Sequence, residues 1–221
     1  MRIRITFAKL GALRYTGHLD LHKLWERAAR RAELPLAYSQ GFHPQPKMNI
    51  AAALPLGFSS RCEALDMRLE HEISLDGLRE KLQGTLPTGI QVMDVESVDE
   101  RAPALQTQVI SAEYEVSLTE SSPSTSLRTS FGSEVKRRIE SVLESESIIR
   151  TRRGKEYDLR PLVEELSLTP APLPEGEGQE MRVFMKLAAR EGATGRPEEV
   201  LDVLGIAFED TRIERTRLIF R

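Results

Sequence analysis

The ten residues from Tyr38 to Lys47 combine aromatic, imidazole, amide and ammonium groups with one glycine and two prolines. The prolines restrict the backbone, so such a loop has little conformational entropy left to lose when a ligand binds. Aromatic rings stack on unpaired bases, and an ammonium group can pair with a phosphate. We therefore name the following candidate contacts: Tyr38, Ser39, Gln40, Gly41, Phe42, His43 and Lys47. The alternative is a structural connection that only needs these backbone angles.

A helix is expected over residues 18–32, directly before this loop. Its apolar residues, Trp25 among them, follow the i, i+3, i+4, i+7 spacing of a buried stripe. The opposite side is basic and could hold a phosphate backbone. The candidate contacts on or just before the helix are Arg14, His18, Lys23, Arg27, Arg30 and Arg31. The alternative is an ordinary solvated helix face, with Trp25 in the core.

His18 and His22 lie four residues apart, the spacing of two metal ligands on one helix face. Asp20 lies about half a turn from both and is a poor third ligand, so we predict no metal site. A capping or hydrogen-bonding role is expected for His18, with Thr16 as a helix cap.

A second basic spot surrounds Arg153-Gly154, a pair typical of a hairpin turn. Its members are Arg152, Arg153, Lys155 and Arg160. A hairpin tip of this kind could reach into RNA. The alternative is an exposed turn held by pairing between Asp158 and Arg160.

Several kinds of chemistry find no support in the sequence. Cys62 is the only cysteine, so the chain cannot form an internal disulfide or build an iron–sulfur or thiolate zinc site alone. Walker, dinucleotide-binding and nucleophile-elbow motifs are absent, and we expect no cofactor. Neither a membrane-spanning apolar run nor a signal peptide is recognisable, so we expect a cytoplasmic protein with no membrane partner.

The charge of the chain is unevenly distributed. The net charge is −3 in 221 residues, yet residues 1–47 hold nine Lys or Arg and three acids, a net charge of +6. Residues 48–148 carry −8 and the remainder −1. Such a basic end on a weakly acidic protein predicts a local anionic partner rather than diffuse polycation binding.

Residues 1–97 are expected to form one domain. Periodicity and turn residues predict strands at 2–9, 48–54, 61–70 and 90–95, helices at 18–32 and 75–86, and a short strand at 36–38. This is the β-α-β-β-α-β order of the ferredoxin-like plan.

After a linker at 98–107, residues 108–221 are expected to repeat this plan. The predicted strands are 109–118, 148–152, 155–159, 181–187 and 212–220. The predicted helices are 134–144, 197–204 and a short one within 158–168. A mobile loop is expected at 121–133 and a loop at 169–179. The fold class is therefore α+β, as two tandem ferredoxin-like units with antiparallel sheets.

Three stretches resemble the radical-SAM-linked protein family, whose members are fused to, or encoded beside, a radical SAM protein. They are Arg14-Tyr15-Thr16-Gly17-His18-Leu19-Asp20, residues 34–46, and Ala53-Leu54-Pro55-Leu56-Gly57. Tyr157-Asp158-Leu159-Arg160-Pro161 and residues 196–201 resemble its later, weaker motifs. The resemblance implies a radical SAM protein as partner and, through the gene setting of the family, a role in RNA metabolism. It implies no activity of its own.

The expected function is a non-catalytic module that binds RNA or a substrate for a radical SAM enzyme. One alternative is a metal-independent RNA endonuclease, since tandem ferredoxin-like units resemble CRISPR-repeat processing endonucleases. There His43 or His18 would be the general acid or base, with Lys47 or Arg14 stabilising charge. A second alternative is a protein-interaction adaptor for the radical SAM partner.

Overall fold

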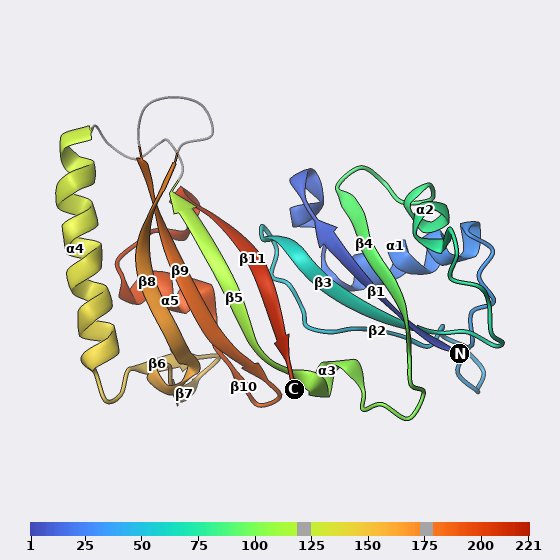
Figure 1. Cartoon of the computed structure of the whole chain (residues 1–221). Coiled ribbons are helices and arrows are strands. Elements are labelled where there is room, and N and C mark those ends of the chain that lie inside the picture. The colour runs from blue at the N-terminus through green and yellow to red at the C-terminus, as the bar shows by residue number, and fades with distance from the viewer. Residues whose placement is uncertain (119–124, 173–178) are drawn as a thin grey trace. The chain divides into compact units, whose positions relative to one another are not determined.

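The chain, seen as a computed structural model, is described over residues 1–118, 125–172 and 179–221 (Figure 1). It divides into two compact units. Unit 1 comprises Met1–Val109 with Phe220–Arg221, and unit 2 comprises Ile110–Ile219.

Unit 1 is an antiparallel sheet with two principal helices. Its strands follow the order β2-β3-β1-β4, and every neighbouring pair is antiparallel. Along the chain the elements are β1 (Arg2–Lys9), η1 (Gly11–Tyr15), α1 (His18–Arg31), β2 (Met48–Ile50), β3 (Ser59–Arg68), α2 (Leu78–Gln83), β4 (Ile90–Val98) and α3 (Leu105–Gln108).

The core of unit 1 lies between its sheet and the helices α1 and α2. Alternation along β1 turns Ile3, Ile5 and Phe7 to this side, and all three are fully buried. Trp25 of α1 is also fully buried, as predicted, and its ring lies 4.8 Å from that of Phe7 in an edge-on arrangement. Leu82 brings α2 into the same cluster.

Three predicted boundaries in unit 1 are wrong for local reasons. The N-cap of α1 is Gly17 rather than Thr16, and no side chain caps it. Helix α2 begins only at Leu78 because Gly77 is left-handed, with φ 69°. Residues 36–38 form isolated bridges, Leu36 to Leu69 and Tyr38 to Pro46, instead of a strand.

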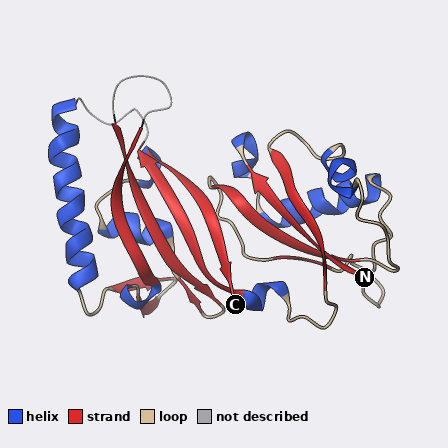
Figure 2. Cartoon of the chain, in the orientation of Figure 1, coloured by secondary structure: helices blue, strands red, loops and turns tan. Residues whose placement is uncertain are grey.

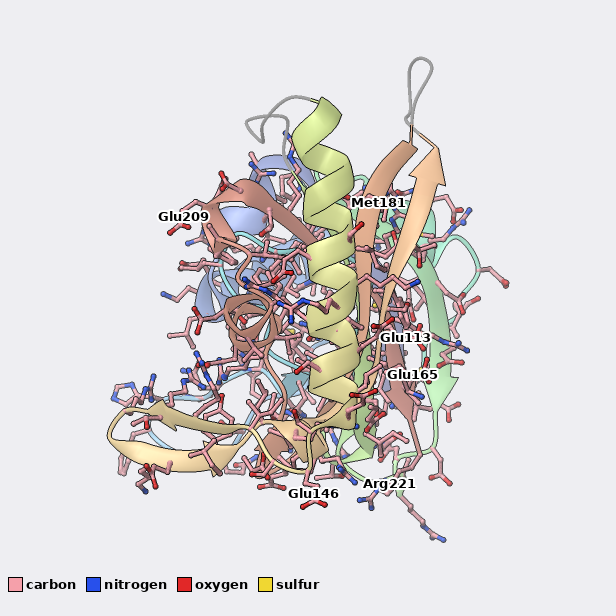
Figure 3. All side chains as sticks on the ribbon, turned by 90° about the vertical axis from the view of Figure 1, so that its left-hand side faces the viewer. Glu113, Glu146, Glu165, Met181, Glu209 and Arg221 are labelled. Atoms are coloured by element: carbon pink, nitrogen blue, oxygen red, sulfur yellow. The ribbon has the colours of Figure 1, made fainter. Side chains whose placement is uncertain are left out.

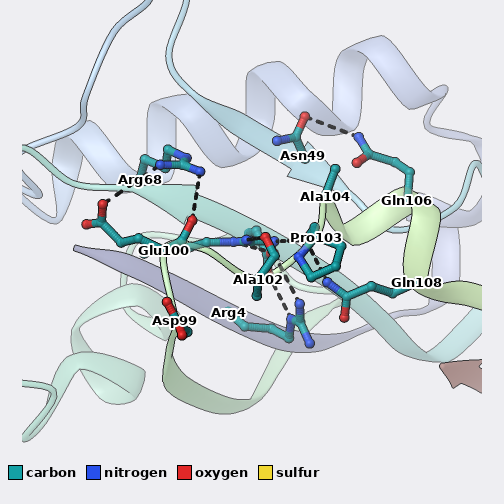
Figure 4. Close-up of polar contacts among 12 residues, drawn as sticks. Arg4, Asn49, Arg68, Asp99, Glu100, Ala102, Pro103, Ala104, Gln106 and Gln108 are labelled. Atoms are coloured by element: carbon teal, nitrogen blue, oxygen red, sulfur yellow. Dashed lines mark hydrogen bonds and ion pairs between the residues drawn. The ribbon is translucent and has the colours of Figure 1, made fainter. Parts of the chain in front are cut away.

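The predicted linker at 98–107 is held against unit 1 (Figure 4). Arg2 donates to the carbonyl oxygens of Ala102 and Pro103, at 2.7 and 2.9 Å. Gln106 donates to the side chain of Asn49 at 3.1 Å. The segment therefore belongs to the unit before it, which its polar and proline-containing composition did not indicate.

Unit 2 is a second mainly antiparallel sheet with two helices. Its strand order is β8-β9-β5-β11, with β10 also on β9. Pairs β8–β9 and β5–β9 are antiparallel, and β11 runs opposite to β5 (Figure 1). The elements are β5 (Val109–Leu118), α4 (Thr125–Glu144), β6 (Ile149–Arg152), β7 (Lys155–Asp158), η2 (Arg160–Leu162), β8 (Val163–Pro172), β9 (Gln179–Arg190), β10 (Ala193–Thr194), α5 (Pro197–Val203), η3 (Phe208–Asp210) and β11 (Thr211–Phe220).

Helix α4 packs on the sheet of unit 2 through one apolar stripe. Val135, Ile139 and Val142 are buried, while Leu143 at the edge of the predicted face is exposed. Figure 3 views α4 from the front, with Glu165 of β8 and Met181 of β9 behind it. Figure 2 shows the strands of each unit against the helices that cover them.

Three predicted segments of unit 2 differ from the structure. Residues 125–133 of the expected loop are helical and extend α4, and residues 121–124 lie outside the described residues. The short helix expected within 158–168 is the three-residue 3₁₀ helix η2, and from Val163 the segment is strand β8, because pairing with β9 supplies hydrogen bonds that no local pattern reveals. Of the expected loop at 169–179, residues 169–172 continue β8, residue 179 begins β9 and 173–178 lie outside the described residues.

The α+β class and the mainly antiparallel sheets agree with the sequence prediction. In the described part of the chain, no helix is long and apolar enough to span a bilayer.

Candidate nucleic-acid interface

The loop of residues 38–47 is closed by hydrogen bonds at its base. The amide of Ser39 donates to the carbonyl of Gln45 at 2.8 Å, and the amide of Gln45 donates to the Ser39 hydroxyl at 2.9 Å. The amide of Lys47 donates to Ala37 O at 2.8 Å. These bonds hold together the two chain segments at the base of the loop and leave a short tip at residues 40–44.

The tip exposes one aromatic ring. The relative exposure of Phe42 is 102%, so its ring touches almost nothing in the chain. Gly41 before it has φ 129°, a region open only to glycine. Gln40 and His43 are also exposed. The tip therefore offers a ring, an amide and an imidazole to a ligand.

Tyr38 plays a different part from Phe42. It is half-buried and packs against the core of unit 1. The guanidinium of Arg30 lies 5.8 Å from its ring centroid. Tyr38 thus joins the loop to α1, and its ring is already partly covered.

The loop borders α1 over two helical turns. At one end Arg30 lies over Tyr38, and at the other His22 Nε2 is 3.3 Å from the carbonyl oxygen of Met48. Eight residues of helix separate these contacts, about 12 Å along the axis. The side of α1 that carries these two contacts is the row His22, Glu26 and Arg30.

Helix α1 presents three cations at i, i+4 and i+8: Lys23, Arg27 and Arg31. All are exposed, and among the described residues none forms an ion pair or a side-chain hydrogen bond. Like charges at this spacing destabilise a helix by about 0.2–0.5 kcal/mol a pair. We call this set the cation ladder.

Arg30 is set apart from the cation ladder by its own acid. Its guanidinium is 2.7 Å from the carboxylate of Glu26 one turn earlier. Lys47, at the base of the loop, is exposed and has no side-chain partner among the described residues. Of the predicted cations near the loop, Lys47 and the cation ladder are therefore open to a ligand.

Arg14 serves the turn before α1. Its guanidinium lies 4.8 Å from the Tyr15 ring centroid and donates to the Tyr15 hydroxyl at 2.9 Å. The buried ammonium of Lys9 donates to the Thr16 carbonyl at 2.9 Å and fixes the same turn. Neither Lys9 nor Tyr15 was among the predicted site residues. Tyr15 lies within the first family-like stretch, which was the one sequence signal for it.

Two exposed leucines near this turn were also missed by the sequence reasoning. Leu19 is 75% exposed in the first turn of α1, and Leu56 is 61% exposed. The amide of Gly57 donates to the Arg14 carbonyl at 2.9 Å, which sets the Leu56 turn beside η1.

The histidines do not form a metal site in the described part of the chain, where no group of three or more ligating side chains occurs. His18 opens α1 and is exposed, as is His43 on the tip. Neither imidazole has a hydrogen-bond partner among the described residues, so nothing in the chain orients it as a catalytic acid or base requires.

The second basic spot is a two-stranded hairpin, as predicted. Its turn residues Arg153 and Gly154 have φ 48° and 75°, as a type I′ turn demands. Arg150 fixes the hairpin to α5 through Glu199, 3.0 Å away, and Asp202. The candidates Arg152, Arg153 and Lys155 lie at the turn of the hairpin, the end away from α5.

Arg160 does not share that open position. Its guanidinium donates to the carbonyls of Val163 at 2.9 Å and Leu143 at 3.0 Å. Asp158 accepts the amides of Ile148 and Arg160, and the first of these bonds is the main cause that lowers the pKa of its carboxyl. Burial raises the pKa of Tyr157 on the same hairpin.

Comparison with known proteins gives a family and two distant structural likenesses. No curated protein matches the chain. A chain of "Crystal Structure of a Cbf5-Nop10-Gar1 Complex" aligns at 12% identity and a TM-score of 0.46, over 98% of this chain and 48% of that one. The present chain thus spans about half the length of that solved chain.

"Crystal Structure of an Unknown Protein from Galdieria sulphuraria" aligns at 13% identity over 100% of this chain and 98% of that one, with a TM-score of 0.26. Both TM-scores are below 0.5, so neither likeness carries a fold or a function to this chain. Residues 2–197 match the family described as "Uncharacterized protein conserved in bacteria (DUF2344)". The chain therefore belongs to the DUF2344 family.

Proposed function

We propose that this protein is a cytoplasmic RNA-binding module without catalytic activity of its own, and that it serves a radical SAM enzyme. The observation that carries the RNA proposal is the pairing of open cations with an aromatic tip. The cation ladder is on the helix that contacts the loop through Arg30, and Lys47 is at the base of this closed loop, whose Phe42 is fully exposed. Cations that neutralise phosphates and a ring that stacks on a base are the two elements of nucleic-acid binding.

The arrangement of charges on α1 supports an anionic ligand rather than an ordinary solvated helix face. Solvation alone would allow acids between the cations, as at Glu26 and Arg30. The cation ladder instead keeps three like charges at the spacing where they repel one another. A polyanion along α1 would remove that repulsion.

The test is a double variant, Lys23→Ala with Arg27→Ala, in the full chain. Each lost phosphate contact lowers the slope of log affinity against log salt by about 1, so we expect a decrease of about 2 and weaker RNA binding. Titration of labelled RNA at several salt concentrations measures both. Alanine is a good helix former, so α1 should remain intact.

The matched control is Arg79→Ala with Lys81→Ala on α2, which removes the same charge from the other main helix of unit 1. Both residues pair with acids, Arg79 with Glu80 and Lys81 with Glu33. An equal loss in both double variants would mean a net-charge effect, and an unchanged affinity in the α1 variant would refute the proposed surface.

The radical SAM partner is proposed from the resemblance of the three stretches in the first half of the chain. Such an enzyme would supply an iron–sulfur cluster that a chain with Cys62 alone cannot hold. Co-purification of a radical SAM protein from the cells that make this chain, after nuclease treatment, tests the link. Failure to form any complex would refute the proposed radical SAM partner but would not affect the proposed RNA binding.

We also infer that both units follow the ferredoxin-like plan. Unit 1 has the order β-α-β-β-α-β and the strand order β2-β3-β1-β4. Unit 2 has the same order once the β6–β7 hairpin and β10 are treated as additions. An experimental structure with another strand order in either unit would overturn this.

A further inference from the structure

We propose that the surface beside α1 takes single-stranded RNA, with one unpaired base stacked on Phe42. The inference rests on the proposed RNA-binding function and adds the class of RNA. It depends on the exposure of the ring, the closure of the loop and the layout of the cations.

The Phe42 ring is positioned by backbone rather than by packing. Its exposure of 102% leaves its faces open to a partner. A Cβ added at Gly41 would meet no atom within 4 Å, so this glycine is needed for its φ of 129° and not for lack of space. A backbone conformation that favours glycine therefore presents the apolar ring to solvent, where a partner could cover it.

The loop keeps the ring from collapsing onto the protein. Bonds between Ser39 and Gln45 and between Lys47 and Ala37 fix its base, and Pro44 stiffens the return. Little entropy remains to be lost when a base stacks on such a tip.

Stacking on Phe42 requires a base that is not already stacked in a duplex. Double-stranded RNA is contacted instead through its backbone and minor groove, and its bases lie between their neighbours. The other aromatic residues near α1 and the loop offer less. Trp25 is fully buried, Arg30 lies over the ring of Tyr38, and Arg14 lies over the ring of Tyr15. The surface therefore provides for one unpaired base.

The cation ladder also fits one strand. Successive members are four residues apart, about 6 Å along the axis, and the whole ladder spans about 12 Å. The shorter separation is close to that of neighbouring phosphates in one strand. A single row along one helix follows one backbone, and Lys47 adds an exposed cation at the base of the loop.

The test compares labelled oligouridylate with an RNA duplex of equal length, using the full chain and Phe42→Ala. We expect wild-type protein to prefer the single strand. Stacking of one base predicts that Phe42→Ala weakens single-strand binding roughly 5- to 100-fold. The salt slope should stay unchanged, because no phosphate contact is removed. Phe42→Tyr, which keeps an aromatic face, should bind nearly as wild type does.

A second readout uses Phe42→Trp, whose exposed indole should lose emission when oligouridylate stacks on it, while Trp25 stays buried. Equal binding of duplex and single strand, with Phe42→Ala unaffected, would overturn the single-strand inference and keep RNA binding. Failure to bind either RNA would overturn both. Circular dichroism should show that the variants keep the fold, because the Phe42 side chain touches almost nothing.

Discussion

At the scale of single residues, Asp66 of β3 is the polar centre of unit 1. It is 3% exposed and accepts the guanidinium groups of two β1 residues, with Arg2 Nε at 2.9 Å and Arg4 Nε at 2.8 Å. Arg2, itself 4% exposed, continues the network to Ala102 and Pro103. These residues alternate with Ile3 and Ile5, so the network lies on the face of the sheet away from the core.

Replacing Asp66 with alanine should leave Arg2 buried without its acid. Removal of one partner from a buried pair destabilises proteins by about 3–5 kcal/mol. Urea unfolding of Asp66→Ala measures the loss, with the exposed Glu72→Ala as a control that should change little. A decrease in unfolding free energy below about 1 kcal/mol would show that water hydrates the Arg2 guanidinium in the variant.

At the scale of elements, the β6–β7 hairpin shows how a short ribbon is kept in place. Two strands of four residues are marginal alone. Its base, at the end away from the turn, is fixed to α5 by Arg150, and Asp158 in the neighbouring pair accepts two backbone amides there. The hairpin is therefore anchored to α5, and its turn carries Arg152, Arg153 and Lys155.

The Asp158 contribution should depend on pH. Its folded pKa lies below the ordinary aspartate value of about 3.9. Its stabilisation is therefore complete above that value and is lost as pH falls through the lower folded pKa. Unfolding free energies of wild type and Asp158→Asn, measured from pH 5 to pH 2, should converge in acid. A difference that stays constant over this range would contradict the assignment.

At the scale of the whole molecule, the chain holds a core in unit 1 that uses no residue beyond Val95. The segment at 99–108 adds to this unit the fully buried Leu105 of α3 and the two carbonyls that Arg2 binds. The +6 charge of residues 1–47 lies within the same unit. Unit 1 thus contains its own core and the whole proposed RNA surface.

A fragment of residues 1–109 should fold cooperatively, with a calorimetric unfolding enthalpy of about 60–80 kcal/mol for its size. The matched fragment 1–97 lacks Ala102 and Pro103, leaves Arg2 donors unsatisfied and should melt roughly 5–10 °C lower. Scanning calorimetry compares the two. Equal melting temperatures would show that residues 98–109 are only a connection.

The sequence by itself determined the local features of this protein. Alternation placed the strand at 2–9, periodicity placed the helix at 18–32 with Trp25 inside, and glycine with proline marked the loop at 38–47. The hairpin at Arg153-Gly154 was predictable because its turn geometry demands those φ angles. Each of these features depends on residues close together in the chain.

Only the tertiary structure decided what depends on distant partners. The helix predicted within 158–168 is limited to the three residues of η2 because β8 pairs with β9 from Val163 on. The predicted linker belongs to unit 1 because Arg2 donates to two of its carbonyls. Tertiary contacts also separated the cations: Arg160 binds Leu143 O, whereas Lys23 and Arg27 stay open. Charge is a property of the residue, but its availability to RNA depends on which acceptors the fold brings within reach.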